Sequence, residues 1–128
     1  MIKSVIKGYG YYVPENVVTN DDLSKLMTTN DEWITERTGI KERRHRKNRN
    51  DSEETTAFLA KKAAEKALEK ANLTAKDLDF IVFATLSPDY FFPGSGVALQ
   101  DMLGCDTIGA LDVRNQCSGF VYAMSVAN

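Results

Sequence analysis

The residue with the clearest chemical potential is Cys117, which stands between a predicted strand and a predicted helix. Residues 108–113 are short and apolar, as is typical of an interior strand, and a helical pattern begins at Ser118. The first amides of a helix lack partners and carry the positive end of the helix dipole. A thiol placed there ionises more readily, and the thiolate is a nucleophile. The same amides can hold an oxyanion that forms on an attacked carbonyl.

The alternative is that Cys117 is a small core side chain, because most free cysteines are buried and inert. The helix after it mixes small residues with large apolar ones, namely Phe120, Val121, Met124 and Val126. We therefore expect this helix to be buried on nearly all sides. Gly119 at its start would allow the backbone to be approached closely. Cys105 receives no role.

A second group of chemical interest is Trp33 with Arg37, which lie four residues apart and so project from one face of a predicted helix. An indole beside a guanidinium suits a flat aromatic base that carries phosphates. Thr29 with Glu32 predicts a capping box at the start of this helix, and Gly39 predicts its end. The alternative is a helix whose lone tryptophan covers a core.

Both groups carry a resemblance to a known family. The segment Asp112-Val113-Arg114-Asn115-Gln116-Cys117-Ser118-Gly119-Phe120 resembles the nucleophile segment of β-ketoacyl-(acyl-carrier-protein) synthase III, a thiolase-like condensing enzyme. Residues 29–40 resemble a second signature of these synthases. The resemblance runs from about Ile2 to Asn128 and covers the first part of the family's usual chain. It implies an α/β protein, the N-terminal half of a thiolase-like layered fold, with a mixed, largely buried sheet and helices on both faces.

The resemblance also implies a reaction, a decarboxylative Claisen condensation that initiates fatty acid synthesis. Cys117 would take the acyl group of an acyl-CoA as a thioester, and malonyl-acyl-carrier protein would lose carbon dioxide and attack that thioester. In the family, a histidine and an asparagine from the later half assist the second step. Nothing in this chain matches their motifs. We therefore expect residues 1–128 to be one incomplete domain, from a fragment or a split gene, that is inactive in condensation alone.

Further roles follow from the same resemblance. Trp33 would stack on the adenine of coenzyme A, and Thr29 and Arg37 would help to hold its nucleotide end. Phe92 would reach the acyl pocket of a neighbouring subunit, so a homodimer is expected. The coenzyme A thioester is a substrate, and no cofactor or metal is expected.

Two alternatives to this enzyme remain open. One is a non-catalytic fragment or scaffold half that needs a partner chain to fold. The other is a related condensing enzyme of the polyketide or 3-hydroxy-3-methylglutaryl-CoA synthase type. The segment with Trp33 and Arg37 disfavours this last reading.

Composition limits the partners and the compartment. The net charge of −2 is unlike that of a polycation for nucleic acid. Two cysteines do not make a disulfide framework, so a reducing cytoplasm is expected. The longest strongly apolar run, residues 80–86, is too short to span a bilayer, and no membrane partner is expected.

Capping and turn residues predict the other elements. We expect strands at 3–13, 80–86 and 108–113, and helices from Thr19 to about Met27, after Thr29, from an Asp51–Glu54 capping box to Ala71, at 95–103 and from Ser118. Asn72 and Gly104 should end two of these helices. Gly8, Gly10 and Pro14 are interpreted as turn residues.

Two loops need separate interpretation. Tyr90, Phe91 and Phe92 are consecutive aromatic residues in a loop, so the loop either meets a partner or folds onto its own core. The basic run at 41–50 indicates a solvated loop, or a docking segment for an acidic carrier protein or for phosphates. Its histidine, His45, has cationic neighbours, which suit neither a metal site nor a general base.

Overall fold

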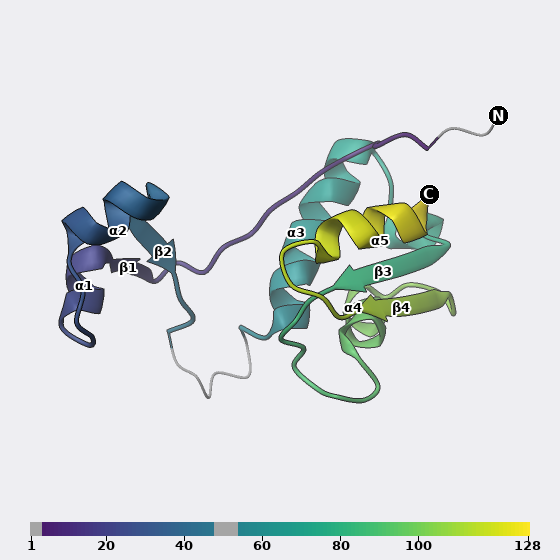
Figure 1. Ribbon diagram of the computed structural model, residues 1–128. Coiled ribbons are helices and arrows are strands. Elements are labelled where there is room, and N and C mark those ends of the chain that lie inside the picture. Colours follow the sequence, from purple (N-terminus) through teal and green to yellow (C-terminus); the bar gives the residue numbers. More distant parts are fainter. Residues whose placement is uncertain (1–3, 48–53) are drawn as a thin grey trace. The chain divides into compact units, whose positions relative to one another are not determined.

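The chain forms two compact units in the computed structural model, which describes residues 4–47 and 54–128. The first unit contains the opening segment up to Tyr12 and the chain from Thr55 onward. The second unit is Val13–Glu54. Figure 1 labels the helices and strands of both units.

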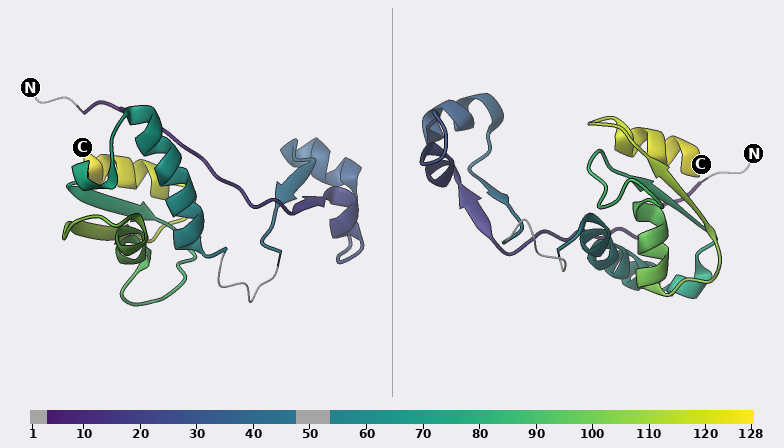
Figure 2. Two further views of the ribbon diagram at one scale, coloured as in Figure 1. Left: turned by 180° about the vertical axis from the view of Figure 1, so that it is seen from behind. Right: turned by 90° about the horizontal axis from the view of Figure 1, so that it is seen from below.

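The first unit is built on two parallel strands, β3 (Phe80–Ala84) and β4 (Gly109–Val113), which pair from Phe80↔Gly109 to Ala84↔Val113. Its helices are α3 (Thr56–Ala71), a short 3₁₀ helix η1 (Ala75–Asp77), α4 (Ser95–Leu103) and α5 (Gly119–Ala127). Helix α4 covers one face of the strand pair, α3 packs on α4, and α5 lies on the opposite face (Figure 2). The expected α/β layered fold with helices on both faces is confirmed.

The core of this unit lies between the sheet and α4. Ile81 and Phe83 alternate along β3 and are buried against Leu99 of α4. Cys105 lies half-buried at the edge of this core. Further apolar side chains pack around it: Ala60, Leu103, Ile108 and Ala110. Among the described residues, no helix has the length and hydropathy that a bilayer span requires.

Helix α5 is more exposed than its composition predicts. Phe120 keeps 71% of its surface, and Val121, Met124 and Val126 are also exposed, whereas Gly119 and Ala123 are buried. The reason is that α5 packs on β3 and β4 along one side only. An open, apolar hollow of about 620 Å³ lies between α5 and β3. The prediction of burial on nearly all sides is wrong for this chain.

The opening segment is not a strand, although its residues favour one. Residues 4–13 run without a ladder partner, and Lys3 lies outside the described residues. The segment lies instead along α3, where a Cβ on Gly8 would overlap the carbonyl oxygen of Ala67, and one on Gly10 that of Ala63. These glycines therefore permit close approach to a helix, and the turn interpretation is wrong for both of them.

Lysine side chains of α3 contact the tyrosine rings of this segment. The ammonium of Lys70 lies 3.8 Å from the ring centroid of Tyr9, and that of Lys66 lies 5.6 Å from the ring of Tyr11. The Lys66 ammonium also donates to the Tyr11 carbonyl at 3.2 Å. Cation–π contacts therefore replace the strand pairing that the tyrosines predicted.

Helix ends were predicted well where the signal is local. Asn72 ends α3 and Gly104 ends α4, both in the left-handed conformation. Helix α3 begins later than predicted, because the Thr55 hydroxyl caps it by accepting from the Phe58 amide at 3.1 Å. The predicted capping residue Asp51 lies outside the described residues.

The second unit pairs β1 (Val17–Thr19) with β2 (Glu42–Arg44) in antiparallel register, and its helices are α1 (Asn20–Ser24) and α2 (Asp31–Thr38). The predicted capping box of Thr19 and Asp22 is present, but α1 ends at Ser24 rather than near Met27. The Lys25 ammonium, 2.9 Å away, and the Thr19 hydroxyl and amide hold the pKa of Asp22 far below its usual value.

Two aspartates from distant segments cap two helices of the first unit, α3 and α4. The Asp112 carboxylate, near the end of β4, accepts from the amides of Ser95 at 2.7 Å and Gly96 at 2.8 Å, which begin α4. Gly94, with φ +111°, leaves room for this carboxylate. Charged acceptors at a helix N-terminus bind amides that lack partners within the helix, and their negative charge interacts favourably with the helix dipole. Asp112 therefore joins the sheet to α4.

Asp89 holds the start of α3 in the same way. Its two carboxylate oxygens accept from the amides of Thr56 at 2.7 Å and Ala57 at 2.8 Å. The Thr56 hydroxyl donates back to the Ser87 carbonyl at 3.0 Å. The loop between β3 and α4 is therefore tied to the start of α3.

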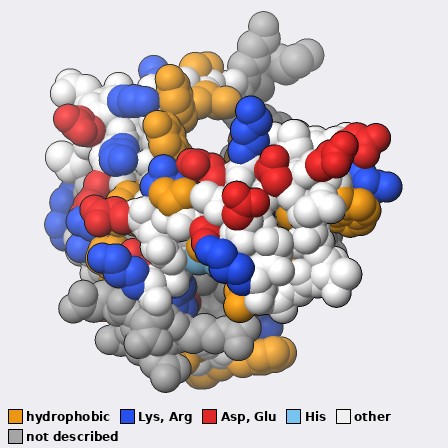
Figure 3. Space-filling model, turned by 90° about the vertical axis from the view of Figure 1, so that its left-hand side faces the viewer, with side chains coloured by type: hydrophobic (Ala, Val, Ile, Leu, Met, Phe, Trp, Pro, Cys, Tyr) orange, Lys and Arg blue, Asp and Glu red, His pale blue; other side chains and the backbone are white. Residues whose placement is uncertain are grey.

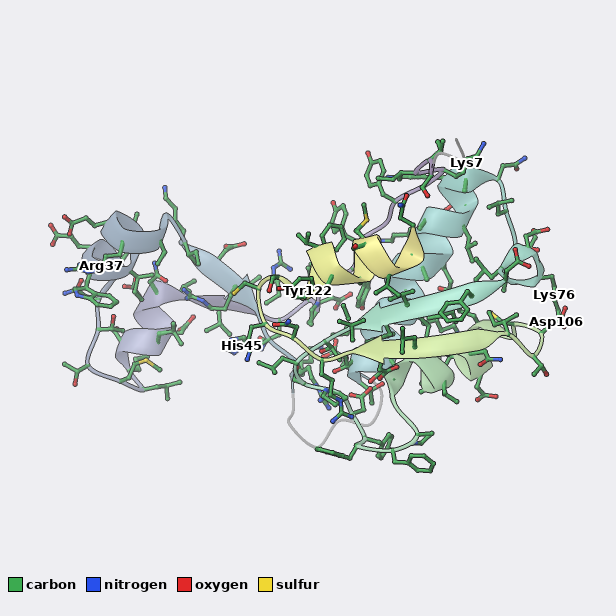
Figure 4. The ribbon with its side chains drawn as sticks, turned by 45° about the vertical axis from the view of Figure 1, so that its right-hand side comes forward. Lys7, Arg37, His45, Lys76, Asp106 and Tyr122 are labelled. Atoms are coloured by element: carbon green, nitrogen blue, oxygen red, sulfur yellow. The ribbon has the colours of Figure 1, made fainter. Side chains whose placement is uncertain are left out.

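We expect Asp112→Asn to lower the free energy of unfolding by about 2 kcal/mol, because one charge-assisted bond is lost and an amide group faces a backbone donor. Asp106→Asn is the matched control. Asp106 pairs with Lys76 at 2.5 Å on the surface (Figure 4), and such exposed pairs contribute at most about 1 kcal/mol. Urea denaturation of the variants measures the difference, and equal losses would contradict this role of Asp112.

Candidate functional site

Cys117 lies in the turn between β4 and α5 and is exposed. The turn borders an open groove of about 320 Å³ whose other wall is the last residue of β3 and the two residues after it, 84–86. Cys117 therefore stands where the sequence predicted, outside the strand and just before the helix. The alternative that it is a buried core side chain is wrong for this chain.

The turn around Cys117 is closed by local hydrogen bonds. The Gln116 amide donates to the Asn115 side-chain oxygen at 2.7 Å, and the Gly119 amide donates to the Gln116 carbonyl at 2.9 Å. The helical ladder begins with the Tyr122 amide, which donates to the Ser118 carbonyl at 3.0 Å. An oxyanion that bound to the Gly119 amide would therefore compete with the Gln116 carbonyl for the hydrogen of that amide.

The aromatic loop between β3 and α4 is exposed. Phe91 and Phe92 keep 88% and 89% of their surface, and Tyr90 is exposed as well. The alternative that this loop folds onto its own core is therefore wrong. Phe91 meets Arg114, whose guanidinium carbon lies 4.3 Å from the ring centroid and whose Nη2 donates to the Phe91 carbonyl at 2.9 Å.

Trp33 and Arg37 lie together on α2 in the second unit, as predicted. The guanidinium carbon of Arg37 is 4.5 Å from the centroid of the Trp33 ring. Trp33 keeps 52% of its surface, so it does not serve mainly as the cover of a core. Arg37 is labelled on α2 in Figure 4.

Thr29 lies beside this pair, but it does not cap α2. Asn30 is the capping residue, because its side-chain oxygen accepts from the Trp33 amide at 2.7 Å. The hydroxyl of Thr29 is shielded from solvent and has no hydrogen-bond partner among the described residues. Thr29, Asn30 and Trp33 line an open hollow of about 310 Å³. An unpaired shielded hydroxyl beside an exposed ring suits a polar ligand group.

Known proteins share the segments that form these two sites. No protein-family model matches the chain. A β-ketoacyl-[acyl-carrier-protein] synthase III of Psychromonas ingrahamii is 49% identical over 127 residues, which are 99% of this chain and 39% of the relative. The crystal structure of 3-oxoacyl-[acyl-carrier-protein] synthase III from Aquifex aeolicus matches with a TM-score of 0.88 and 48% identity, over 95% of this chain and 38% of that one.

Over nearly its whole length, the chain matches β-ketoacyl-[acyl-carrier-protein] synthase III. It matches the N-terminal part of these synthases and spans about 39% of the length of the curated relative. A more distant match is the priming β-ketosynthase of the R1128 polyketide pathway, with a TM-score of 0.87 and 32% identity over 95% of this chain and 35% of that one. The thiolase-like fold inferred from the sequence is thus confirmed.

The structure groups the predicted synthase residues by unit. Thr29, Trp33 and Arg37 lie together in the second unit, whereas Cys117 and Phe92 belong to the first. Within residues 4–47 and 54–128, no group of three or more His, Cys, Asp or Glu side chains is placed to hold a metal ion.

The basic run is partly structural in the described residues 41–47. Arg43 donates to the Asn20 side-chain oxygen at 2.6 Å, and Arg44 donates to the Pro14 carbonyl at 3.4 Å. The His45 amide donates to the Asn16 carbonyl at 3.0 Å. Acidic and basic side chains are interspersed on the face shown in Figure 3. Residues 48–50 of the run lie outside the described residues.

Sequence reasoning missed Asn20, which organises the second unit. Asn20 keeps 1% of its surface and is buried with Pro14 and Ile34, the other buried residues described in this unit. Its amide group donates to the Asp31 carboxylate at 2.7 Å and to the Ile40 carbonyl at 2.8 Å. Because its oxygen accepts from Arg43, Asn20 links both ends of α2 to β2. The position after a capping threonine gave no sign of this role.

We expect Asn20→Ala to lower the free energy of unfolding of the second unit by about 2–3 kcal/mol, since the buried Asn20 side chain is bonded to three polar partners that would lose these bonds. Trp33 is the only tryptophan of the sequence, so its fluorescence during denaturation reports on this unit. Asn16→Ala serves as the control, because Asn16 contributes its backbone carbonyl to the unit. An Asn20→Ala variant with an unchanged denaturation midpoint would show that the hydrogen bonds of Asn20 do not stabilise this unit.

Proposed function

We propose that this chain supplies the nucleophile and the coenzyme A-binding segment of an acyltransferase. The complete enzyme condenses an acyl-CoA primer with malonyl-acyl-carrier protein and so initiates fatty acid synthesis. The proposal covers a cytoplasmic homodimer that uses coenzyme A thioesters as substrates and needs no cofactor. Nucleic acid and membranes are not partners in this proposal.

One observation supports this proposal above the others. Cys117 is exposed in a strand-to-helix turn and borders an open groove, in a chain that is 49% identical to a synthase III. A nucleophile must be accessible to the carbonyl of its substrate and must stand clear of core packing. The position of Cys117 meets both requirements.

The reaction proceeds in two transfers. The Cys117 thiolate attacks the acyl-CoA carbonyl, the carbon–sulfur bond to coenzyme A breaks, and the coenzyme A thiolate leaves and takes up a proton. Malonyl-acyl-carrier protein then loses carbon dioxide, and the electron pair of the broken bond forms a new carbon–carbon bond to the acyl carbon. The Cys117 thiolate leaves, and a β-ketoacyl-carrier protein is released.

The second unit offers a surface for the nucleotide end of coenzyme A. Adenine would stack on the exposed ring of Trp33, beside the guanidinium of Arg37, which would contact the phosphates. The shielded hydroxyl of Thr29 would gain the partner it lacks within the described chain. Phe92, at the tip of the exposed loop, would form a wall of the acyl pocket in the neighbouring subunit.

A second candidate function is a non-catalytic half that requires a partner chain. The exposed apolar side of α5 supports it, because a monomeric protein rarely exposes so many large side chains together. A related condensing enzyme of polyketide type is a third candidate, since a priming β-ketosynthase shares the fold at 32% identity. The non-catalytic half gives the exposed Cys117 no role, and the segment with Trp33 and Arg37 disfavours the polyketide type.

We expect Cys117 to be acylated when the complete synthase is incubated with acetyl-CoA, and intact mass spectrometry measures the adduct. Cys117→Ala should abolish the adduct, because it removes the only sulfur that the groove exposes. Cys105→Ala should leave the adduct unchanged, since Cys105 lies at the edge of the core. Absence of an adduct on the natural enzyme would favour the non-catalytic half.

We expect Trp33→Ala to weaken the binding of coenzyme A about tenfold, because stacking on a base contributes about 1–3 kcal/mol. Binding of pantetheine, which lacks the nucleotide, should not change. Leu26→Ala is the control variant, as it removes an exposed apolar side chain of the same unit. Calorimetric titration measures both ligands, and equal weakening of the two would contradict the assignment of Trp33 to adenine.

A further inference from the structure

Arg114 joins the segment that carries Cys117 to the exposed aromatic loop. It lies three residues before Cys117, and its guanidinium makes two contacts with one residue. The guanidinium carbon is 4.3 Å from the centroid of the Phe91 ring, and Nη2 donates to the Phe91 carbonyl at 2.9 Å. Arg114 thus holds both the side chain and the backbone of Phe91.

The rest of this loop is anchored elsewhere. At its beginning, Ser87 and Asp89 are bonded to the start of α3. At its end, the amide of Ser95 is bonded to Asp112. Between these anchors, Arg114 makes the described contact that holds the middle of the loop, where Phe92 follows Phe91. The position of Phe92 is therefore coupled to the backbone that leads into Cys117.

We propose that Arg114 is a positioning residue that determines which acyl chains are accepted, because it holds the loop whose Phe92 forms a wall of the acyl pocket in the neighbouring subunit. This inference rests on the proposed function, in which Phe92 forms a wall of an acyl pocket. Arginine suits the role better than lysine, since its planar group stacks on a ring while it donates to a carbonyl.

The test compares the rates at which acetyl-CoA and hexanoyl-CoA acylate Cys117 in the complete synthase. We expect Arg114→Ala to change the ratio of the two rates by about five- to tenfold, which corresponds to the loss of one exposed cation–π contact and one hydrogen bond. Phe91→Ala should change the ratio by less, because it removes the ring but keeps the carbonyl that accepts from Arg114. Arg114→Lys should restore part of the natural ratio. The double variant should equal Arg114→Ala, because that substitution alone already removes both contacts with Phe91.

Lys76→Ala is the control variant, since it removes a surface cation of the same unit that pairs with Asp106. Its ratio should equal that of the natural enzyme. An unchanged ratio in Arg114→Ala, an equal fall of both rates, or additive effects in the double variant would overturn the inference.

A second measurement separates this inference from the proposed function. Hydrogen exchange of the backbone amides at 90–92 should be about five- to tenfold faster in Arg114→Ala than in the natural protein, whether or not Cys117 is acylated. Faster exchange without acylation of the natural enzyme would refute the synthase function but would still support the role of Arg114 in holding the loop. Unchanged exchange would refute that role of Arg114.

Discussion

The bidentate contact between Asp112 and the first turn of α4 is the constraint on which the first unit depends. Residue 112 pairs with Phe83 in the sheet, so its backbone belongs to the core layer, while its carboxylate accepts from two helix amides. One residue therefore fixes both the end of a strand and the start of a helix. The loop with Phe92 leads into the start of α4, and the turn with Cys117 follows the end of β4. Asp112 therefore helps to fix the positions of both.

The two units are stabilised by different kinds of interaction. The first packs Ile81 and Phe83 of the sheet against Leu99, in an ordinary apolar core. The second has few buried residues and relies on the hydrogen bonds of Asn20. Polar networks of this kind specify one arrangement, because each partner is costly to leave unsatisfied. Such a unit suits a rigid platform for the Trp33–Arg37 pair.

Prediction from the sequence succeeded where one segment determines its own structure. The capping box of Thr19, the left-handed ends at Asn72 and Gly104, and the turn before α5 each depend on neighbouring residues. The pairing of Trp33 with Arg37 follows from helical spacing alone. The roles proposed for these residues rest on the family resemblance, because spacing alone could not suggest them.

Prediction failed where the partner lies far along the chain. The opening residues favour a strand, yet their neighbour is a helix more than fifty residues later, whose Ala63 and Ala67 receive Gly10 and Gly8. Asp112, Asp89 and Asn20 act on distant amides and carbonyls, so composition gave no sign of their roles. The exposure of α5 was missed because apolar composition reports a preference for burial and does not identify a covering element.

The order of the units along the chain has a consequence for how the protein folds. The first unit is discontinuous, since the chain leaves it at Tyr12 and returns at Thr55, so the second unit is an insertion between two of its segments. During synthesis the opening segment emerges long before the helix that receives it. The second unit, whose contacts are contiguous in sequence, can form in the meantime. Completion of the first unit must then close a large loop, which is the slow kind of step in folding.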